Sequence, residues 1–242
     1  MIVVPTAPWA HYAGDAAAWL GAALAARWQH RRWPEPGRAL ARTAAPGYFV
    51  APGLGALAGA WLFGSSNTLR SLVAAPSHSI AGALAGGIVA VELWKRRHRV
   101  RRSTGGVFAL PIAVGIAIGR LGCLFAGLPD YTYGTPTRLP WAVDLGDRVG
   151  RHPVELYESL AMAAFAAAYV HARVRGARWA THHAFHAMVI IYAAQRFAWE
   201  FLKPYPTLIG PLNVFHLLTL GLIAYGILWW RHDDDADAFR TG

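Results

Sequence analysis

Seven stretches of mostly apolar residues divide this sequence, and their length constrains the fold more than any other feature. A helix needs about 20 apolar residues to cross the hydrocarbon core of a bilayer. The stretches lie at residues 9–28, 46–64, 78–94, 105–128, 153–174, 179–202 and 207–230. Only 15% of the residues are charged, whereas a soluble domain has about a quarter. The sequence therefore predicts an all-α integral membrane protein, a bundle of about seven transmembrane helices that forms a single multi-pass domain over residues 1–242.

The basic residues between these stretches predict how the chain is oriented. Sixteen Lys and Arg residues lie in segments 27–45, 95–104 and 173–178 and in the tail after 230. Five lie in the segments on the opposite side, namely Arg70, Arg138, Arg148, Arg151 and Lys203. Positive charge gathers on the cytoplasmic side of membrane proteins, so we expect the N-terminus outside and the C-terminus in the cytoplasm. The net charge of +10 follows this membrane pattern, and we expect no nucleic-acid partner.

The cysteine and histidine residues of the sequence do not predict a metal centre. Cys123 is the single cysteine of the sequence, which excludes an intramolecular disulfide. His182 and His186 share one helix face, but the sequence identifies no third ligand. We therefore expect neither a metal nor another cofactor. No basic residue precedes Arg27, so we expect the first apolar stretch to be retained rather than cleaved as a signal peptide.

Charged residues inside the apolar stretches mark the candidate site. A charge at the membrane centre costs about 2.5–3.5 kcal/mol on insertion scales, so it usually marks function or a charged partner. Arg120 lies in the fourth stretch, and Arg196 lies in the sixth with Glu200 one helical turn later. The planar donor fork of arginine suits phosphate, which favours a pocket for an anionic head group. The alternative is that an Arg196–Glu200 pair and an outward-reaching Arg120 only adjust helix packing.

A polar segment at residues 151–158, Arg-His-Pro-Val-Glu-Leu-Tyr-Glu, opens the fifth stretch. Arg151, His152 and Glu155 would surround the outer mouth of the bundle, where a polar substrate would enter. The structural alternative is that Glu155 and Glu158 only stabilise the first helical turn, where negative charge favours the helix dipole. The preceding loop, at about 129–152, is long, and covering a site is one reason for such a loop to be ordered.

Four consecutive motifs resemble those of the prolipoprotein diacylglyceryl transferases. Gly-Arg-Leu-Gly-Cys at 119–123 is followed by Tyr-Gly-Thr-Pro-Thr at 133–137, Leu-Pro-Trp-Ala-Val at 139–143 and the polar segment 151–158. The family has Gly-Arg-x-Gly-Asn, Gly-Arg-Pro-Thr, Leu-Pro-Trp-Gly-Val and Arg-His-Pro-Ser-Gln-Leu-Tyr-Glu in the same order. Arg-Phe-Ala-Trp-Glu-Phe at 196–201 is similar to the family's Arg-Phe-x-x-Glu-Phe. Seven spans with an outer N-terminus also fit the family.

The resemblance implies a phospholipid-dependent enzyme of the bacterial cytoplasmic (inner) membrane. The family reaction moves the diacylglyceryl group of phosphatidylglycerol onto the lipobox cysteine thiol of a prolipoprotein signal peptide, and glycerol phosphate leaves. The substrate-binding residues that the motifs imply are Arg120, Cys123, Gly134, Arg151, Glu155, Arg196 and Glu200. The catalytic candidates are Tyr12, His78 and His152. Two alternatives remain, a divergent member with another acceptor or donor and a non-enzymatic phospholipid-binding or transport protein.

Departures from the family pattern fit a divergent relative with an altered substrate or rate as well as they fit a working transferase. The family's asparagine after Gly-Arg-x-Gly is Cys123 here, and its second asparagine is Ala126. The acid two residues later is Leu128, with Asp130 as a displaced substitute. The family's histidine before a Gly-Gly pair corresponds to Ala81. The expected phosphate-binding arginines are thus present, whereas several of their polar neighbours are not.

Overall fold

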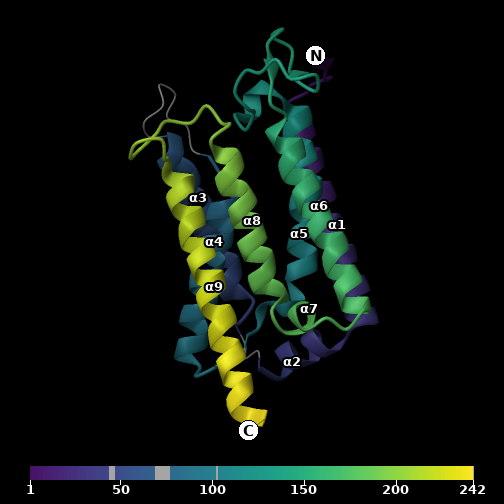
Figure 1. Cartoon of the computed structure of the whole chain (residues 1–242), viewed down its shortest axis with the longest axis vertical. Helices are drawn as coiled ribbons and strands as arrows, with labels where there is room; N and C mark the ends of the chain where they lie inside the picture. The colour runs from purple at the N-terminus through teal and green to yellow at the C-terminus, as the bar shows by residue number, and fades with distance from the viewer. Residues whose placement is uncertain (44–46, 69–76, 102, 242) are drawn as a thin grey trace.

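Seven long helices lie side by side in the computed structural model, which describes residues 1–43, 47–68, 77–101 and 103–241 (Figure 1). They are α1 (Trp9–Arg32), α3 (Val50–Thr68), α4 (Ile80–Arg97), α5 (Ala109–Ala126), α6 (Val154–Val174), α8 (Ala184–Glu200) and α9 (Val214–Thr241). The shorter helices α2 (Glu35–Thr43) and α7 (Arg178–His182) and the 3-10 turns η1 (Gly105–Val107) and η2 (Leu128–Asp130) connect them. The predicted helical class is therefore confirmed.

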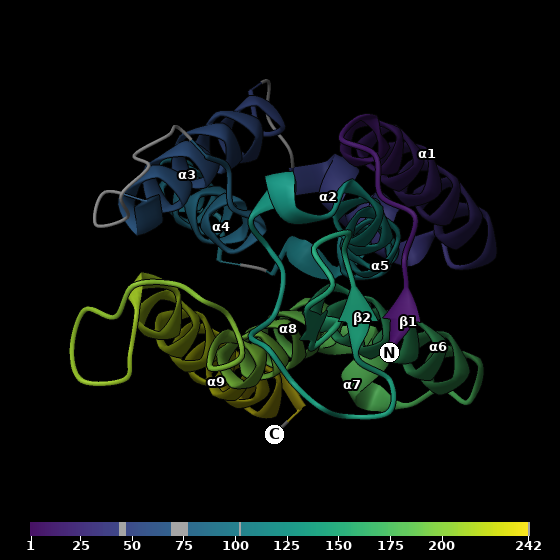
Figure 2. The same cartoon turned by 90° about the horizontal axis from the view of Figure 1, so that it is seen from above.

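A small sheet, which the sequence did not predict, caps one end of the bundle. Its strands are β1 (Ile2–Val3), β2 (Val143–Asp144) and β3 (Gly150–Arg151), in the order β1-β2-β3. β1 is parallel to β2 and β2 is antiparallel to β3. The N-terminal segment is thereby hydrogen-bonded to the long loop between α5 and α6, above the helix ends (Figures 1 and 2).

Two predicted helix boundaries are wrong. The seventh helix was expected from residue 207 but begins at Val214, because Gly210 has a positive φ and Pro211 lacks an amide hydrogen. The sixth stretch divides at His183 into α7 and α8. The expected start of the second stretch at residue 46, together with Arg70 and Arg102, lies outside the described residues.

Two of the described helices are long and apolar enough to cross a membrane by length and composition. They are Ala109–Ala126, with a mean hydropathy of 1.9, and Val214–His232, with a mean hydropathy of 1.4. The first is 61% buried inside the structure, whereas only 28% of the second is buried. The other long helices carry more alanine, glycine or charge, and their exposed faces hold large apolar side chains such as Trp19, Leu54 and Leu93.

Helix pairs set the arrangement of the bundle. α3 packs against α4, α1 against α5, α5 against α6 and α8 against α9 (Figure 2). The core lies mainly among α5, α6, α8 and α9 and includes the fully buried Met162, Met188 and Tyr192. The glycine-rich runs at 55–59 and 82–87 lie at the contact between α3 and α4, where small residues allow helices to approach closely. A Cβ atom at Gly59 would lie 2.2 Å from the carbonyl oxygen of Gly82.

Replacing Gly59 with alanine should therefore destabilise the protein. The new methyl group would force α3 and α4 apart, and overpacking of this kind costs about 1–3 kcal/mol. Gly53→Ala on the same helix is the matched control, because nothing lies within 4 Å of a Cβ atom there. Thermal unfolding of the detergent-purified variants measures the difference. Equal unfolding midpoints for the two variants would contradict the close approach of α3 and α4.

Candidate functional site

A buried ion-pair cluster joins α5, α6 and α8, and Glu158 lies at its centre. Glu158 is fully buried and its two carboxylate oxygens contact Arg120 of α5 and Arg196 of α8. The ammonium of Lys203, just beyond the end of α8, lies 2.9 Å from Oε1 of the same carboxylate. One carboxylate is thus shared by three cations from separate parts of the chain.

A second carboxylate, Glu200, holds Arg196 from the other side. Its Oε2 lies 2.9 Å from Nη2 of Arg196, one helical turn earlier on α8. Its Oε1 accepts a hydrogen bond of 2.9 Å from the side-chain amide of Asn213, which precedes α9. The guanidinium of Arg196 also lies 5.3 Å above the ring of Phe215. These contacts fix the plane of the guanidinium. The pairing of Arg196 with Glu200 that the sequence suggested is present in the structure.

The cluster carries an excess of positive charge. Arg120, Arg196 and Lys203 face the two carboxylates Glu158 and Glu200, which leaves one net positive charge. Burial, followed by the charge of Arg196, lowers the pKa of Lys203. Nε of Arg196 is buried and makes no hydrogen bond to any described residue. A single phosphodiester anion would balance the charge and accept from this donor.

An apolar cavity of about 480 Å³ extends from this end of the bundle between α1, α3, α4, α5 and α9. Gly119, adjacent to Arg120, and Asp15 line it near the cluster, and Lys95 and Trp229 line it near the other helix ends. Most of its wall is aliphatic or aromatic, with residues such as Ile112 along its length. The volume and lining suit an apolar ligand with one polar end.

The loop between α5 and α6 covers the cluster. The amide of Thr135 donates a 2.6 Å hydrogen bond to the carbonyl oxygen of Leu202, immediately before Lys203. The hydroxyl of Tyr205 donates to the carbonyl oxygen of Tyr131 at 2.9 Å. The loop is therefore bonded directly to the segment that carries Lys203, as expected for a loop that is ordered by covering a site.

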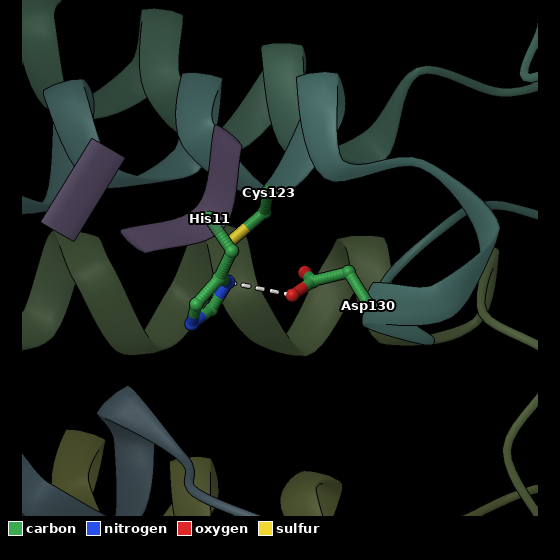
Figure 3. Close-up of side chains that lie close together, drawn as sticks. All are labelled: His11, Cys123 and Asp130. Atoms are coloured by element: carbon green, nitrogen blue, oxygen red, sulfur yellow. Dashed lines mark ion pairs between the residues drawn. The ribbon is translucent and has the colours of Figure 1, made fainter. Parts of the chain in front are cut away.

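Next to Arg120, the start of α1 meets the end of α5. Nδ1 of His11 lies 2.6 Å from Oδ1 of Asp130, and Cys123 lies beside both (Figure 3). The thiol of Cys123 is 3.8 Å from Nη1 of Arg120. The hydroxyl of Thr132 lies 2.7 Å from Asp130 and 3.1 Å from Glu155. Glu155 is buried, so the predicted Cys123 and Glu155 both adjoin the arginine cluster.

Arg151 and Gly134 lie in the covering loop. Arg151 makes a two-pronged ion pair with Asp147, at 2.6 and 2.7 Å, and its guanidinium lies 5.2 Å above the ring of Tyr133. The guanidinium holds the pKa of Asp147 below its usual range. A Cβ atom at Gly134 would lie 2.3 Å from the carbonyl oxygen of His152. Both residues therefore shape the loop in this structure.

The three catalytic candidates are spread over the molecule. Tyr12 is 75% exposed on the outer surface of α1. His78 lies two residues before α4, and its Cα lies against Gly64 of α3. The ring of His152 packs edge-on against Tyr157 at 6.4 Å. The structure brings together the buried residues Arg120, Cys123, Glu155, Arg196 and Glu200, but it does not gather these three candidates around them.

Sequence reasoning missed four contributors to this region: His11, Glu158, Lys203 and Asn213. Glu158 falls inside an apolar stretch, so the rule that a charge within a membrane span marks function could have identified it, as it identified Arg120. Its position near the start of a helix, where negative charge favours the helix dipole, offered a simpler explanation. Lys203 was counted only among the basic residues between the apolar stretches that predict the orientation of the chain. Nothing in the sequence indicated that His11 and Asp130 meet.

Known proteins resemble this chain along most of its length. The family described as prolipoprotein diacylglyceryl transferase has a model that matches residues 18–231. A relative from Finegoldia magna is 31% identical over 151 residues, which cover 60% of this chain and 59% of the relative. A relative from Gloeobacter violaceus is 32% identical over 166 residues, which cover 63% of this chain and 60% of the relative. Both are named phosphatidylglycerol–prolipoprotein diacylglyceryl transferase.

These matches span about three fifths of the length of the curated relatives. No solved structure matches the chain. The family match, however, runs from within α1 to the apolar part of α9. It includes every member of the buried ion-pair cluster, here also called the arginine cluster: Arg120, Glu158, Arg196, Glu200 and Lys203. This chain belongs to the prolipoprotein diacylglyceryl transferase family.

Proposed function

We propose that this protein transfers the diacylglyceryl group of phosphatidylglycerol to the lipobox cysteine of a prolipoprotein, with release of glycerol phosphate. The observation that carries the proposal is the net-positive cluster of Arg120, Arg196 and Lys203 beside an apolar cavity. The cavity suits the acyl chains of a phospholipid, and the cluster suits its phosphate. The relatives' names specify the same donor and the same acceptor class.

The reaction needs stabilisation of charge on the departing phosphate. The acceptor sulfur attacks the glycerol carbon next to the phosphate oxygen, the carbon–oxygen bond breaks, and negative charge builds on glycerol phosphate. Preorganised donors lower the barrier when they face the position where that charge develops. Arg120 and Arg196 supply such donors, and Glu158 and Glu200 hold them in place before the lipid arrives.

The activity test uses purified protein, phosphatidylglycerol in mixed micelles and a peptide with a lipobox cysteine. Transfer adds the diacylglyceryl mass to the peptide, which mass spectrometry detects. The alternative of a protein that only binds or moves phospholipid predicts binding of phosphatidylglycerol without a change in peptide mass. That result would overturn the proposal.

We further propose that all seven long helices cross the bacterial inner membrane, with the N-terminus outside. The sixteen-to-five distribution of basic residues supports this orientation. Large exposed apolar side chains on α1, α3 and α4, including Trp19, Leu54 and Leu93, support contact with lipid. The arginine cluster and its covering loop would then lie at the outer side, where a prolipoprotein presents its cysteine.

Cysteine labelling tests this orientation. In a Cys123→Ser background, Arg138→Cys in the covering loop should react with an impermeant thiol reagent added to intact cells. Arg175→Cys, at the opposite helix ends, should react only after permeabilisation. Both positions are exposed, so a difference in labelling reports sidedness rather than burial. The reverse pattern would place the arginine cluster on the cytoplasmic side and contradict the orientation.

A further inference from the structure

The outer end of α1 presents a histidine that is paired as an acid–base group would be. Nδ1 of His11 lies 2.6 Å from Oδ1 of Asp130, and the carboxylate of Asp130 is 8% exposed. Thr132 donates to the other carboxylate oxygen at 2.7 Å, which fixes its direction. The imidazole itself is 39% exposed. One ring nitrogen therefore lies against a buried carboxylate (Figure 3), and the partly exposed ring remains accessible to an incoming group.

The pair lies beside the proposed phosphate pocket. Cys123 adjoins His11 and Asp130, with the three ligand atoms all within 4.8 Å of one another. The same thiol is 3.8 Å from Nη1 of Arg120. The second ring nitrogen, Nε2, faces Asp15 at a longer distance of 3.4 Å, and Asp15 lines the apolar cavity. His11 thus stands between the mouth of the cavity and the arginine that would hold the phosphate.

The distances favour a direct ion pair over a metal site at His11, Cys123 and Asp130. Zinc binds nitrogen and oxygen at about 2.0–2.2 Å each in a tetrahedral arrangement, so two such ligands lie more than 3 Å apart. The 2.6 Å between His11 and Asp130 is a hydrogen-bond distance. The guanidinium of Arg120 next to Cys123 also places a positive charge where a cation would bind.

We propose that His11 is the general base of the transfer reaction and that Asp130 is its positioning residue. This inference rests on the proposed function. The acceptor cysteine is largely protonated at neutral pH, because a free cysteine titrates near about 8.5, and the thiolate is the nucleophile. Nε2 of His11 takes the thiol proton as sulfur attacks the glycerol carbon. The carbon–oxygen bond to phosphate breaks, glycerol phosphate leaves, and the proton on His11 passes to it or to water.

Asp130 has a defined part in this step. Its carboxylate lies 2.6 Å from Nδ1, which favours a proton on that nitrogen and leaves Nε2 as the basic one, and it stabilises the imidazolium that forms. The charged and titratable groups that face His11 are Asp15 and Tyr12 on α1, Asp130 on η2 and Cys123 on α5, with Arg120 behind the thiol. Asp15 is 56% exposed, so the acceptor thiol can displace its weaker contact.

Cys123 is not the nucleophile in this scheme. Attack by Cys123 on the glycerol carbon would leave the diacylglyceryl group in a thioether on the enzyme. A second thiol does not readily displace a thioether, so that intermediate would end the reaction. The acceptor brings its own thiol. In this structure Cys123 lies between the ring of His11 and the guanidinium of Arg120.

The test compares the pH dependence of transfer in the wild type, His11→Ala and Asp130→Asn. General base catalysis contributes about 10²–10⁴ in rate, so His11→Ala should lose that much at pH 7. Its rate should then rise steadily toward pH 9, as the acceptor thiol ionises without help, whereas the wild-type rate should level off earlier. Asp130→Asn should show a smaller loss with the same change in profile, and Asp130→Glu should restore part of the rate.

Two controls separate catalysis from folding. His171→Ala removes an exposed histidine near the other end of α6 and should keep the wild-type rate and profile. His11→Ala should keep the wild-type KM for phosphatidylglycerol and the wild-type unfolding midpoint while its rate falls. If His11 had a purely structural role, the loss of rate would come with a change in KM or in the unfolding midpoint.

The outcomes are distinct. A His11→Ala enzyme with the wild-type rate at pH 7 would overturn the general-base assignment and leave the proposed function standing. A wild-type enzyme without transfer at any pH would overturn both. Loss of wild-type activity with a zinc chelator, restored by added zinc, would replace the base with a metal site at the same three residues.

Discussion

Replacing Arg196 with alanine is expected to lower diacylglyceryl transfer by about 10²–10³, the scale for removing one transition-state donor. Among the three cations of the cluster, Arg196 has the most fixed contacts, to Glu158, Glu200 and the ring of Phe215. Its Nε is buried without a hydrogen-bond partner among the described residues. In a site that excludes water, a guanidinium held in this way interacts strongly with an anion.

Lysine at the same position separates charge from geometry. Arg196→Lys keeps the positive charge and loses the planar fork of donors, so its rate should fall between those of the wild type and Arg196→Ala. Arg120→Ala should resemble Arg196→Ala, whereas Arg175→Ala, an exposed arginine far from the cluster, should transfer at the wild-type rate. Initial rates with phosphatidylglycerol and a lipobox peptide give the comparison. Wild-type rates in both cluster variants would rule out the phosphate pocket.

Replacing Glu158 with glutamine should cost the protein more stability than any other single change in the cluster. The carboxylate is fully buried and faces Arg120, Arg196 and Lys203. Without it, three buried cations would be left with Glu200 as the remaining ion-pair partner. Removal of one partner from a buried ion pair costs about 3–5 kcal/mol, which lowers the unfolding midpoint by on the order of 10 °C for a chain of this size.

Glu155→Gln is the matched control, because Glu155 is equally buried and lies one turn earlier on the same helix. Its Oε1 lies 3.1 Å from the neutral hydroxyl of Thr132, a contact that the side-chain amide of glutamine can also make. We expect a shift of the unfolding midpoint much smaller than that of Glu158→Gln. Thermal unfolding in one detergent measures both, and equal shifts would mean that the three cations do not depend on Glu158.

Much of the fold follows from the sequence, because apolar stretches and basic loops are local properties of the chain. The positions of α1, α4, α5 and α6 agree with the apolar stretches to within a few residues. The first turn of α9 was misplaced because Gly210 and Pro211 interrupt a segment that is otherwise apolar enough to continue a helix. The sheet was missed because two-residue strands leave no periodicity to detect.

Site residues could be predicted where a charged side chain lies in an otherwise apolar helix. Contacts between residues far apart in the chain could not be predicted. Arg120 and Arg196 are conspicuous because they interrupt apolar helices. Glu158 had a plausible local explanation at the start of α6, and its actual partners lie 38 residues away on both sides. The meeting of His11 with Asp130 depends on how α1 packs against α5. No local pattern encodes such a contact.

The ion pair between Arg120 and Glu158 also bears on how the chain is assembled in its membrane. Arg120 is synthesised with α5, whereas its partner arrives only with the next helix, 38 residues later. Until then the membrane would hold an unpaired guanidinium, which costs about 2.5–3.5 kcal/mol on insertion scales. Arg196 on α8 meets a Glu158 that is already in place. Biogenesis should therefore release α5 and α6 into the lipid together, as a charge-matched hairpin, and add α8 to it afterwards.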